Sequence, residues 1–515
     1  MKRIYSITIG ILLVISLFAA CGEKGAEQQN GSAVADVFSV GYGKADISPE
    51  KSVFLCGNGD ATKDRMSTGV AERLYATCVA ITDAKGNSAL LISLDLIHAN
   101  KNVIQPLREQ ISEQSGIPFD RIMVACSHNH CGPDMVDTTY RALMVERILQ
   151  ATAEAMESRK PATMETAFAR PEGFNYVRHY LLQDGTYVGE AAGTLPSKTL
   201  YGHYGKADNL LQLVRFNREG DKPVVLINWQ GHGTSGEPNS YTTATPNYPG
   251  ILRSTIEEKL DCYTSFFLGG SGNLASQTLV PTVKDYENYI VLGKALGEEA
   301  AAAANSFQPA NTGDIQVAIG YLDNFGKEAS AGACLYAMSI GDVAFAFAPF
   351  EIFDTNAVAV RNASDFKMTF YATLSNEHYS YLPTDPSFDW VHHYEVRITK
   401  YPKGTAAVVQ EIMTRLLDDC FAASGNAVVE KEAGYITPEF EPASDGIVYL
   451  NPAVGKTDAY TQVANGFCQV SLMDINNNQV KTLLILNAEV AAEVLQHENM
   501  KLLFNEQGVV TGIAE

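Results

Sequence analysis

The feature that most constrains the fold is a regular alternation of short apolar runs and amphipathic segments from Val37 to about Ala423. Ser88–Leu96 and Val343–Phe347 are apolar and short, as expected for buried strands. Between Asn102 and Gln114 apolar residues recur at helical spacing, and Gly116 is placed to end that helix. This alternation predicts an α/β class with a sheet core under helices. Further strands are expected at Ile122–Cys126, Val224–Trp229 and Ser265–Leu268, and further helices at Tyr140–Ser158, Tyr289–Ala304 and Thr405–Ala423.

The pattern changes after Ser424. Ile447–Leu450, Gln469–Met473 and Val480–Leu486 are short alternating segments typical of strands, and three consecutive asparagines from Asn476 are typical of a turn. We therefore expect residues 37–424 to form one large domain and residues 425–515 to form a small β-rich domain.

The N-terminus has the pattern of an export signal. Lys2 and Arg3 precede an apolar run that ends at Phe18, and Ala19-Ala20-Cys21 follows. This pattern predicts a signal peptide over residues 1–20. A cysteine after two alanines resembles a bacterial lipoprotein cleavage site, which predicts lipidation of Cys21 and anchoring to a membrane outside the cytoplasm, with plain secretion as the alternative. Residues 21–36 are polar and suit a flexible tether.

Charge and cysteine content narrow the range of partners. The formal net charge of −21 argues against nucleic acid or an anionic membrane surface as the main partner. The eight cysteines after Cys21 include no C-x-x-C pair, so neither a zinc ribbon nor a thioredoxin-like site is expected. Their spacing leaves disulfide connectivity open.

Two histidines behind a predicted strand are the first candidates for a metal site. His128 and His130 follow the apolar run that ends at Cys126, and Gly132-Pro133 comes directly after them. If the strand continues through the pair, both imidazoles face one side, and the glycine and proline leave them at an open edge. Imidazole is a favoured zinc ligand, so the pair forms half a site. The alternative is a pair of hydrogen-bonded polar histidines.

Two further polar residues also follow apolar runs. His232 lies in a glycine-flanked turn after Val224–Trp229, where a capping or surface histidine is the alternative. Glu351 follows an apolar run that ends at Phe350. A carboxylate there is costly unless it is exposed, paired or bound to metal, although the first turn of a helix is a competing explanation.

Two tyrosines and a glycine-rich segment are less specific. Tyr381 and Tyr394, taken alone, suit half-buried packing. Residues 269–276 contain three glycines behind a predicted strand, which allows close backbone approach. The segment lacks the lysine of a phosphate loop, which argues against nucleotide binding. A tight structural turn is the alternative.

Several of these candidate residues lie in a series of short segments. In chain order they are Gly41-Tyr42-Gly43-Lys44-Ala45-Asp46-Ile47-Ser48-Pro49, Thr68-Gly69-Val70, Leu74-Tyr75-Ala76, Ser93-Leu94-Asp95-Leu96, the His128 segment, the His232 turn, Tyr248-Pro249-Gly250, Tyr381-Leu382-Pro383-Thr384 and Tyr394-Glu395. Their order and context resemble the neutral/alkaline (non-lysosomal) ceramidase family from Val40 to about Lys403. The resemblance implies a large α/β catalytic domain with two β-sheets flanked by helices.

The resemblance also implies site residues. It places a single zinc ion on His128, His232, Glu351 and Tyr381. It makes His130 and Tyr394 groups that lie behind the ligands or orient the substrate, and it puts Asn273 and Ser276 in the catalytic glycine-rich loop. Cys131, Asn247 and the segment 272–276 depart from the residues usual in the family, and these departures bear on ceramide specificity.

On this basis we expect a zinc-dependent amidohydrolase of the neutral ceramidase type, which hydrolyses the N-acyl amide of ceramide-like lipids to a sphingoid base and a fatty acid. One alternative is a zinc hydrolase of the same fold that acts on another acylated or glycan-derived substrate. Another is a binding lipoprotein with weakened catalysis. The expected partners are a lipid or other N-acyl amide substrate and, through the lipid anchor, a membrane.

Overall fold

The computed structural model describes residues 37–57, 65–182, 187–188, 200–203, 205–234, 242–276, 288–322, 332–389, 394–431, 435, 448–449, 455–456, 461–462, 466–473, 479–496, 501–504 and 510–514. The predicted signal peptide, Cys21 and the tether lie outside these residues. Within them, no helix combines the length and the apolar character that a membrane span needs.

The largest element is a mixed nine-stranded sheet. Its strand order is β14 (Tyr263–Leu268), β12 (Val224–Trp229), β11 (Leu211–Arg218), β6 (Lys160–Ala169), β1 (Ser39–Asp46), β3 (Tyr75–Thr82), β4 (Ser88–Leu94) and β5 (Ile122–Cys126), while β16 (Gln308–Ala310) also pairs with β6. Pairs β12–β14 and β4–β5 are parallel, and the other neighbours in the sheet are antiparallel.

This sheet is curved, so that its first strand faces strands far along the order. The Thr77 hydroxyl in β3 lies 2.8 Å from the Ser265 hydroxyl in β14, and Tyr42 in β1 donates a hydrogen bond to the Thr264 carbonyl at 3.1 Å. In β4, Ser93 donates to the carbonyl oxygen of Phe266. The curvature brings the carboxyl ends of β12 and β5 toward each other. In the strand order these two strands are far apart, because β12 is next to the first strand, β14, and β5 is the last, seven positions from β14.

Four helices cover one face of this sheet: α1 (Lys101–Ser115), α2 (Thr138–Glu157), α3 (Asn247–Leu260) and α4 (Tyr289–Ala303). Their ends carry the expected signals. Asn100 and Asp137 accept hydrogen bonds from the first-turn backbone of α1 and α2, and Gly116 ends α1 with a φ of 74°. The apolar faces of these helices and alternate residues of the strands form one buried cluster.

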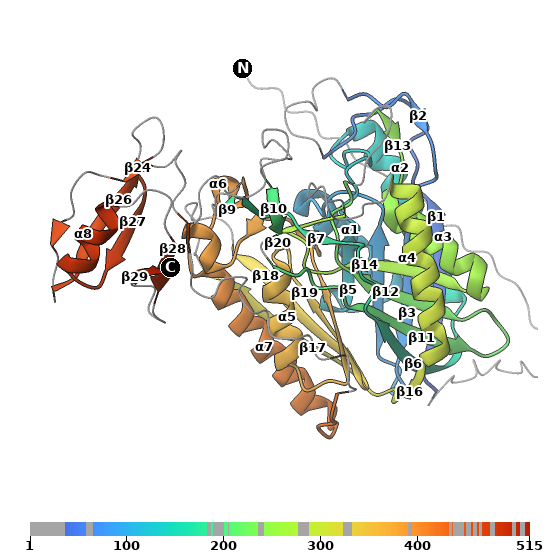
Figure 1. Ribbon diagram of the computed structural model, residues 1–515. Coiled ribbons are helices and arrows are strands. Elements are labelled where there is room, and N and C mark those ends of the chain that lie inside the picture. The colour runs from blue at the N-terminus through green and yellow to red at the C-terminus, as the bar shows by residue number, and fades with distance from the viewer. Residues whose placement is uncertain are drawn as a thin grey trace, which may run out of the picture. The chain divides into compact units, whose positions relative to one another are not determined.

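A second, four-stranded sheet packs on the other face. Its order is β17 (Ile315–Leu322), β18 (Ala333–Ile340), β19 (Val343–Phe347) and β21 (Met368–Ala372). The remaining alternate residues of the large sheet pack against Met338, Phe345 and Phe370 between the two sheets. The opposite face of the small sheet packs under α5 (Asp354–Ala363) and α7 (Thr405–Ser424). The result is helices, sheet, sheet and helices (Figure 1), which confirms the predicted two sheets flanked by helices.

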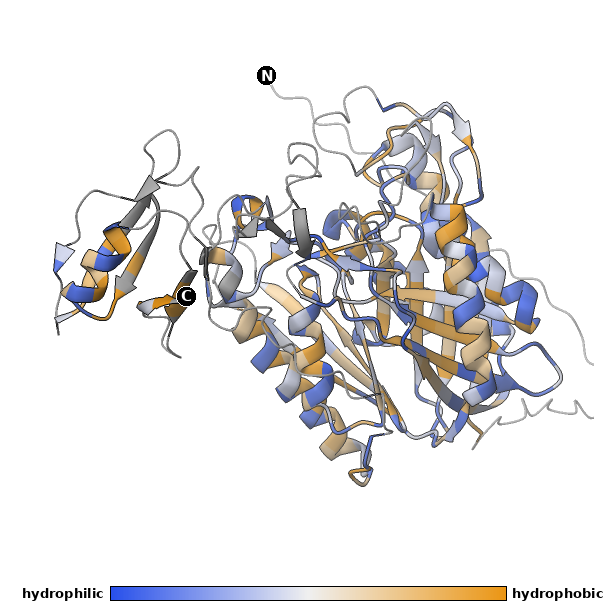
Figure 2. Cartoon of the chain, viewed as in Figure 1, coloured by the Kyte–Doolittle hydropathy of each residue, from blue (hydrophilic) through white to orange (hydrophobic). Residues whose placement is uncertain are grey.

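Hydropathy follows these layers. The central strands are coloured mostly as hydrophobic, whereas α4, α5 and α7 carry both hydrophobic and hydrophilic residues (Figure 2). This is the distribution expected when strands are buried on both faces and helices on one. It explains why the apolar runs at residues 224–229 and 343–347 coincide with β12 and β19.

Short elements gather near the carboxyl ends of β5, β12, β14 and β19. They are β2 (Gly69–Val70) with β13 (Thr243–Ala244), β7 (Tyr176–Val177) with β15 (Leu274–Ala275), β8 (Tyr180–Leu182) with β9 (Tyr187–Val188) and β10 (Leu200–His203), β20 (Glu351–Ile352) with β22 (Tyr381–Leu382), and helix α6 (Tyr394–Ile398). Single 3₁₀ turns span Phe119–Arg121, Ala304–Ser306 and Asp385–Asp389.

The C-terminal segment has its own sheet, ordered β23 (Val448–Tyr449), β28 (Lys501–Phe504), β29 (Val510–Ala514), β27 (Gln479–Ile485), β26 (Cys468–Met473) and β24 (Gly455–Lys456), with β25 (Thr461–Gln462) beside β26. Helix α8 (Ala488–Gln496) packs on it through Ala491 and Val494, an element that the strand pattern did not predict. The β-rich character is as predicted. Tyr435 packs in the core between the nine-stranded and the four-stranded sheet, and the domain boundary after residue 424 stays a prediction.

Candidate metal centre

The candidate site lies where several strands end. His128 follows β5, His232 follows β12, and Glu351 lies in β20, shortly after β19. All three side chains are buried, with at most 8% of the residue surface exposed. The predicted position after strand ends is confirmed, but these side chains are buried rather than at an open edge.

The reason why His128 and His130 face one place differs from the prediction. Strand β5 ends at Cys126, and His128 has a left-handed φ of 59°, so the pair does not lie on a continuing strand. Instead Asn129 forms a parallel bridge with Gly233, and the His130 amide donates to the Gly233 carbonyl at 3.3 Å. A side chain at Gly233 would collide with the His128 carbonyl, so this close approach needs glycine.

Glu351 and Tyr381 are brought together by a short parallel ladder. In the pairing of β20 with β22, Glu351 is directly opposite Tyr381. Gly272 of the glycine-rich segment donates its amide to Ile352 at 2.8 Å, and a side chain there would collide with the Glu351 carbonyl. Residues about 30 positions apart thus project from adjacent strands onto the histidines.

The ring tautomers follow from the backbone. His128 Nδ1 lies 3.0 Å from the Ile97 carbonyl, and His232 Nδ1 lies 3.0 Å from the Ser271 carbonyl. Because a carbonyl oxygen only accepts, both Nδ1 atoms carry a proton, which leaves each Nε2 as a lone pair when the ring is neutral. These two Nε2 atoms are 2.9 Å apart.

Further donor atoms converge on the same point. Glu351 Oε2 lies 3.1 Å from His128 Nε2 and 3.7 Å from His232 Nε2, and it has no hydrogen-bond partner among the described residues. The Tyr381 hydroxyl is 3.4 Å from His232 Nε2, and His130 Nε2 is 3.1 Å from His128 Nε2. One proton can bridge only two of the three acceptors of His128, His232 and Glu351, whereas a cation satisfies all three.

The spacing suits a metal ion. Tetrahedral zinc with bonds of about 2.0 to 2.1 Å places its ligand atoms roughly 3.3 Å from one another, and the separations here run from 2.9 to 3.7 Å. Among the described residues, the group of histidines, cysteines and carboxylates that could hold a metal is His128, His130 and His232, whose ligand atoms all lie within 4.8 Å. His130 thus lies as close as the predicted ligands do.

Burial sets the charges of these groups. It lowers the pKa of His130 and of His232 well below the usual histidine value, and the Arg178 guanidinium lowers the pKa of His232 further. Burial acts to raise the pKa of Glu351, but His128 and His378 hold it well below its usual range. Burial raises the pKa of the Tyr381 phenol. Neutral imidazoles beside an ionised carboxylate are the forms that bind divalent metals.

Sequence reasoning missed a buried ion pair beside the ligands. Arg178 donates to Glu395 at 2.7 Å and to the Gly272 carbonyl at 2.8 Å, and its guanidinium also lies 3.4 Å from His232 Nε2. His179 lies 3.4 Å from Glu395 and outside the metal-competent group. Glu395 follows Tyr394 in a segment that carried the family resemblance, which was the one signal pointing to it.

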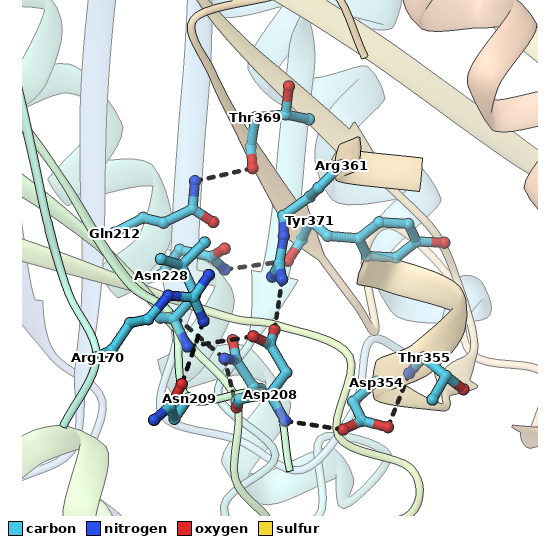
Figure 3. Close-up of polar contacts among 12 residues, drawn as sticks. Arg170, Asp208, Asn209, Gln212, Asn228, Asp354, Thr355, Arg361, Thr369 and Tyr371 are labelled. Atoms are coloured by element: carbon cyan, nitrogen blue, oxygen red, sulfur yellow. Dashed lines mark hydrogen bonds and ion pairs between the residues drawn. The ribbon is translucent and has the colours of Figure 1, made fainter. Parts of the chain in front are cut away.

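The glycine-rich segment supports the ligands rather than facing them. The Asn273 side chain makes two hydrogen bonds with Asp354. Its NH₂ group donates to the Asp354 carboxylate at 2.6 Å, and its oxygen accepts from the Asp354 backbone amide at 2.8 Å. Asp354 in turn accepts from the Asp208 amide at 3.0 Å, and the Asp208 carboxylate pairs with Arg361 (Figure 3). Ser276 donates to the His232 carbonyl at 2.6 Å. In the described contacts both side chains hold the turns in place, and a catalytic role for either stays a prediction.

Tyr394 lies next to a candidate ligand. Its ring is 5.8 Å from the Tyr381 ring at 75°. Cys56, Cys78, Cys126, Cys262, Cys334, Cys420 and Cys468 form no disulfide among the described residues. Cys131, which follows His130 in the chain, is buried.

Comparisons with known proteins found solved structures that have a similar fold. No family model and no curated protein matches the chain. A solved structure described as a ceramidase complexed with C2 matches with a TM-score of 0.63 and 14% identity, covering 87% of this chain and 86% of that one. The neutral ceramidase from Pseudomonas aeruginosa matches with a TM-score of 0.62 and 15% identity over the same shares. At such identities the match shows a shared fold, and the resemblance found in the sequence is confirmed at that level.

Proposed function

We propose that this chain, which has the fold of the neutral ceramidases, is a zinc-dependent amidohydrolase that cleaves the N-acyl amide of ceramide-like lipids. The observation that carries the proposal is the convergence of His128, His232 and Glu351, whose three acceptor atoms face one point where a single proton can bridge only two of them. A buried carboxylate and two neutral imidazoles are retained in such a place for a cation.

The ligand set we propose is His128, His232, Glu351 and Tyr381. Zinc bound there supplies a Lewis acid that polarises the amide carbonyl and lowers the pKa of a water molecule. Each histidine is oriented by a backbone carbonyl on its Nδ1, and Glu351 by its ladder with Tyr381. These outer contacts keep the ligand atoms aimed at one point before any metal arrives.

The surrounding residues act on the substrate. Hydrolysis adds the oxygen of water to the carbonyl carbon and breaks the C–N bond, and the nitrogen leaves as an amine that carries a proton from the water. Negative charge develops on the carbonyl oxygen, and the Arg178 guanidinium is fixed beside the site by Glu395 and the Gly272 carbonyl. His130, whose Nδ1 has no hydrogen-bond partner among the described residues, has an Nε2 that can hold or release a proton at the site.

The test is an activity panel on purified protein supplied with zinc. Ceramides of several acyl lengths, N-acyl amino acids and N-acetylated sugars are incubated with the wild type, with Glu351→Gln and with the control Glu165→Gln, whose carboxylate pairs with Arg215. We expect fatty acid from the ceramides, lost in Glu351→Gln and kept in Glu165→Gln. Acid from the sugars alone would assign a different acyl substrate. No turnover with zinc bound would favour the binding lipoprotein.

We also propose export with lipidation at Cys21, since a membrane anchor would hold the site near lipid substrates. Intact-mass analysis of membrane-extracted protein should show an acylated chain that begins at Cys21, and Cys21→Ser should lose the adduct. A soluble mature chain cleaved elsewhere contradicts this proposal.

A further inference from the structure

A second pair of histidines lies on the outer side of Glu351. His378 Nε2 is 3.2 Å from Glu351 Oε1, while Oε2 of the same carboxylate faces His128 at 3.1 Å. The His98 ring stacks on the His378 ring with centroids 4.4 Å apart and planes at 26°. The two oxygens of Glu351 therefore face different histidines, one on each side of the carboxylate.

The direction of the hydrogen bond follows from the acceptor. An ionised carboxylate only accepts, so His378 must carry its proton on Nε2 and donate it to Glu351. A carboxylate held through one oxygen can no longer rotate freely, so the other oxygen of Glu351 stays directed at His128 and His232. Such contacts behind a ligand decide how well it binds metal.

The segment that carries His378 is strained and clamped. Leu374, Asn376 and Ser380 have positive φ values of 53°, 62° and 94°, a conformation that persists in non-glycine residues only where the surroundings enforce it. Asn376 provides the clamp. Its side-chain oxygen accepts from the backbone amide of Val124 at 2.9 Å, and its backbone amide donates to the Val124 carbonyl at 2.7 Å. Val124 belongs to β5, the strand that leads to His128.

The partner ring is tied to the same ligand. His98 directly follows Ile97, whose carbonyl accepts from His128 Nδ1. One short segment after β4 thus orients His128 through its backbone and covers His378 through its side chain. The stack leaves the His378 ring less freedom to turn away from Glu351.

These two rings are not part of the metal-competent group. In the part of the chain that the structure describes, that group consists of His128, His130 and His232. No hydrogen bond joins His98 to His378 there either, and their contact is a ring stack.

We propose that His378 is the positioning residue of Glu351, and that His98 is the ring that keeps His378 in place. The inference deepens the proposed function, because it rests on a metal at the His128 site, but it does not depend on which substrate is cleaved.

The test measures metal binding and leaves activity aside. Zinc affinity is obtained by competition with a chelator, and the ligand geometry from the visible absorption of the cobalt(II) form. We expect His378→Ala to lower zinc affinity about 10- to 100-fold and to change the cobalt spectrum. His378→Gln, which keeps a side-chain N–H, should restore most of the affinity. His98→Phe should stay near wild type, because it keeps a stacking ring, and His98→Ala should lie between.

The control is His203→Ala, a histidine that contacts Val177, Tyr176 and Tyr180 and lies outside the metal-competent group. Thermal unfolding of each metal-free variant checks that it folds. If His378→Ala and His378→Gln both bind zinc within twofold of wild type with an unchanged cobalt spectrum, the inference is wrong even if the enzyme cleaves ceramide. If the affinities change as expected and no amide is cleaved, the proposed function fails and the inference stands. A wild type that binds no zinc overturns both.

Discussion

Glu351→Gln should remove the stabilisation that zinc gives to the protein while leaving the metal-free fold intact. Glutamine keeps the size of the side chain and brings no new charge into the core, so the packing around residue 351 is preserved. It removes the negative charge that lies 3.1 Å from His128 Nε2. An amide in that place also presents either a neutral oxygen or an N–H group to the metal, and the N–H group repels it.

The size of the effect follows from mass action. Zinc at a thousand times its dissociation constant stabilises the folded state by about 4 kcal/mol. An unfolding entropy of about 2 cal/mol/K per residue, over the roughly 390 residues of the large domain, amounts to about 0.8 kcal/mol/K. Zinc should therefore raise the Tm of the wild type by about 5 °C. For Glu351→Gln, a loss of affinity of about 1,000-fold reduces this rise to less than about 1 °C.

The assay is thermal unfolding by calorimetry, with and without zinc. The metal-free Tm of Glu351→Gln should lie within about 2 °C of wild type, and Glu165→Gln should keep the full rise on adding zinc. A rise in Glu351→Gln equal to that of the wild type would refute the reasoning, since the carboxylate would then not be a ligand. A metal-free variant that is unfolded would show that the carboxylate instead holds the fold together.

Further outcomes follow from the same contacts. His128→Ala and His232→Ala should each abolish stoichiometric zinc in metal analysis, because each removes one of a small set of ligands, and His179→Ala should keep it. Asp95→Ala should cost about 3 to 5 kcal/mol in chemical denaturation, because it leaves the buried Arg253 guanidinium without its carboxylate, whereas Lys259→Ala on an exposed ion pair should cost almost nothing. Burial, with the nearby His378 and His128, lowers the pKa of His98 to about 3. In the folded state His98 therefore stays neutral at pH values below about 6.5, where the same histidine binds a proton in the unfolded chain. As the pH falls, His98 lowers the free energy of unfolding by at most about 1.4 kcal/mol per pH unit. His98→Phe should flatten the fall of unfolding free energy between about pH 6 and pH 4.5, and an unchanged slope would contradict the lowered pKa.

The sequence by itself determined the class of fold and the positions of its main elements. The predicted strand at residues 224–229 coincides with β12, and the predicted helix at residues 289–304 differs from α4 by one residue. These patterns succeed because burial of a strand or of a helix face imposes a local period on the chain, and the helix end at Gly116 is read from a single residue. His128, His232 and Glu351 became candidates for a similar reason, since each follows an apolar run, whereas Tyr381 was a candidate only through the family resemblance.

Only the tertiary structure decided which atoms meet. The two histidines after β5 face one point because His128 takes a left-handed turn and Asn129 pairs with Gly233, not because a strand continues. The Asn273 side chain donates a hydrogen bond to Asp354, and Arg178 forms an ion pair with Glu395, which lies 217 residues away in the chain. The direction of a turn and the choice of a buried charge's partner depend on groups that lie far apart in the chain, and no local pattern carries that information. His378 and His98 show this most clearly, because each occurs in an unremarkable segment and only the fold stacks their rings behind Glu351.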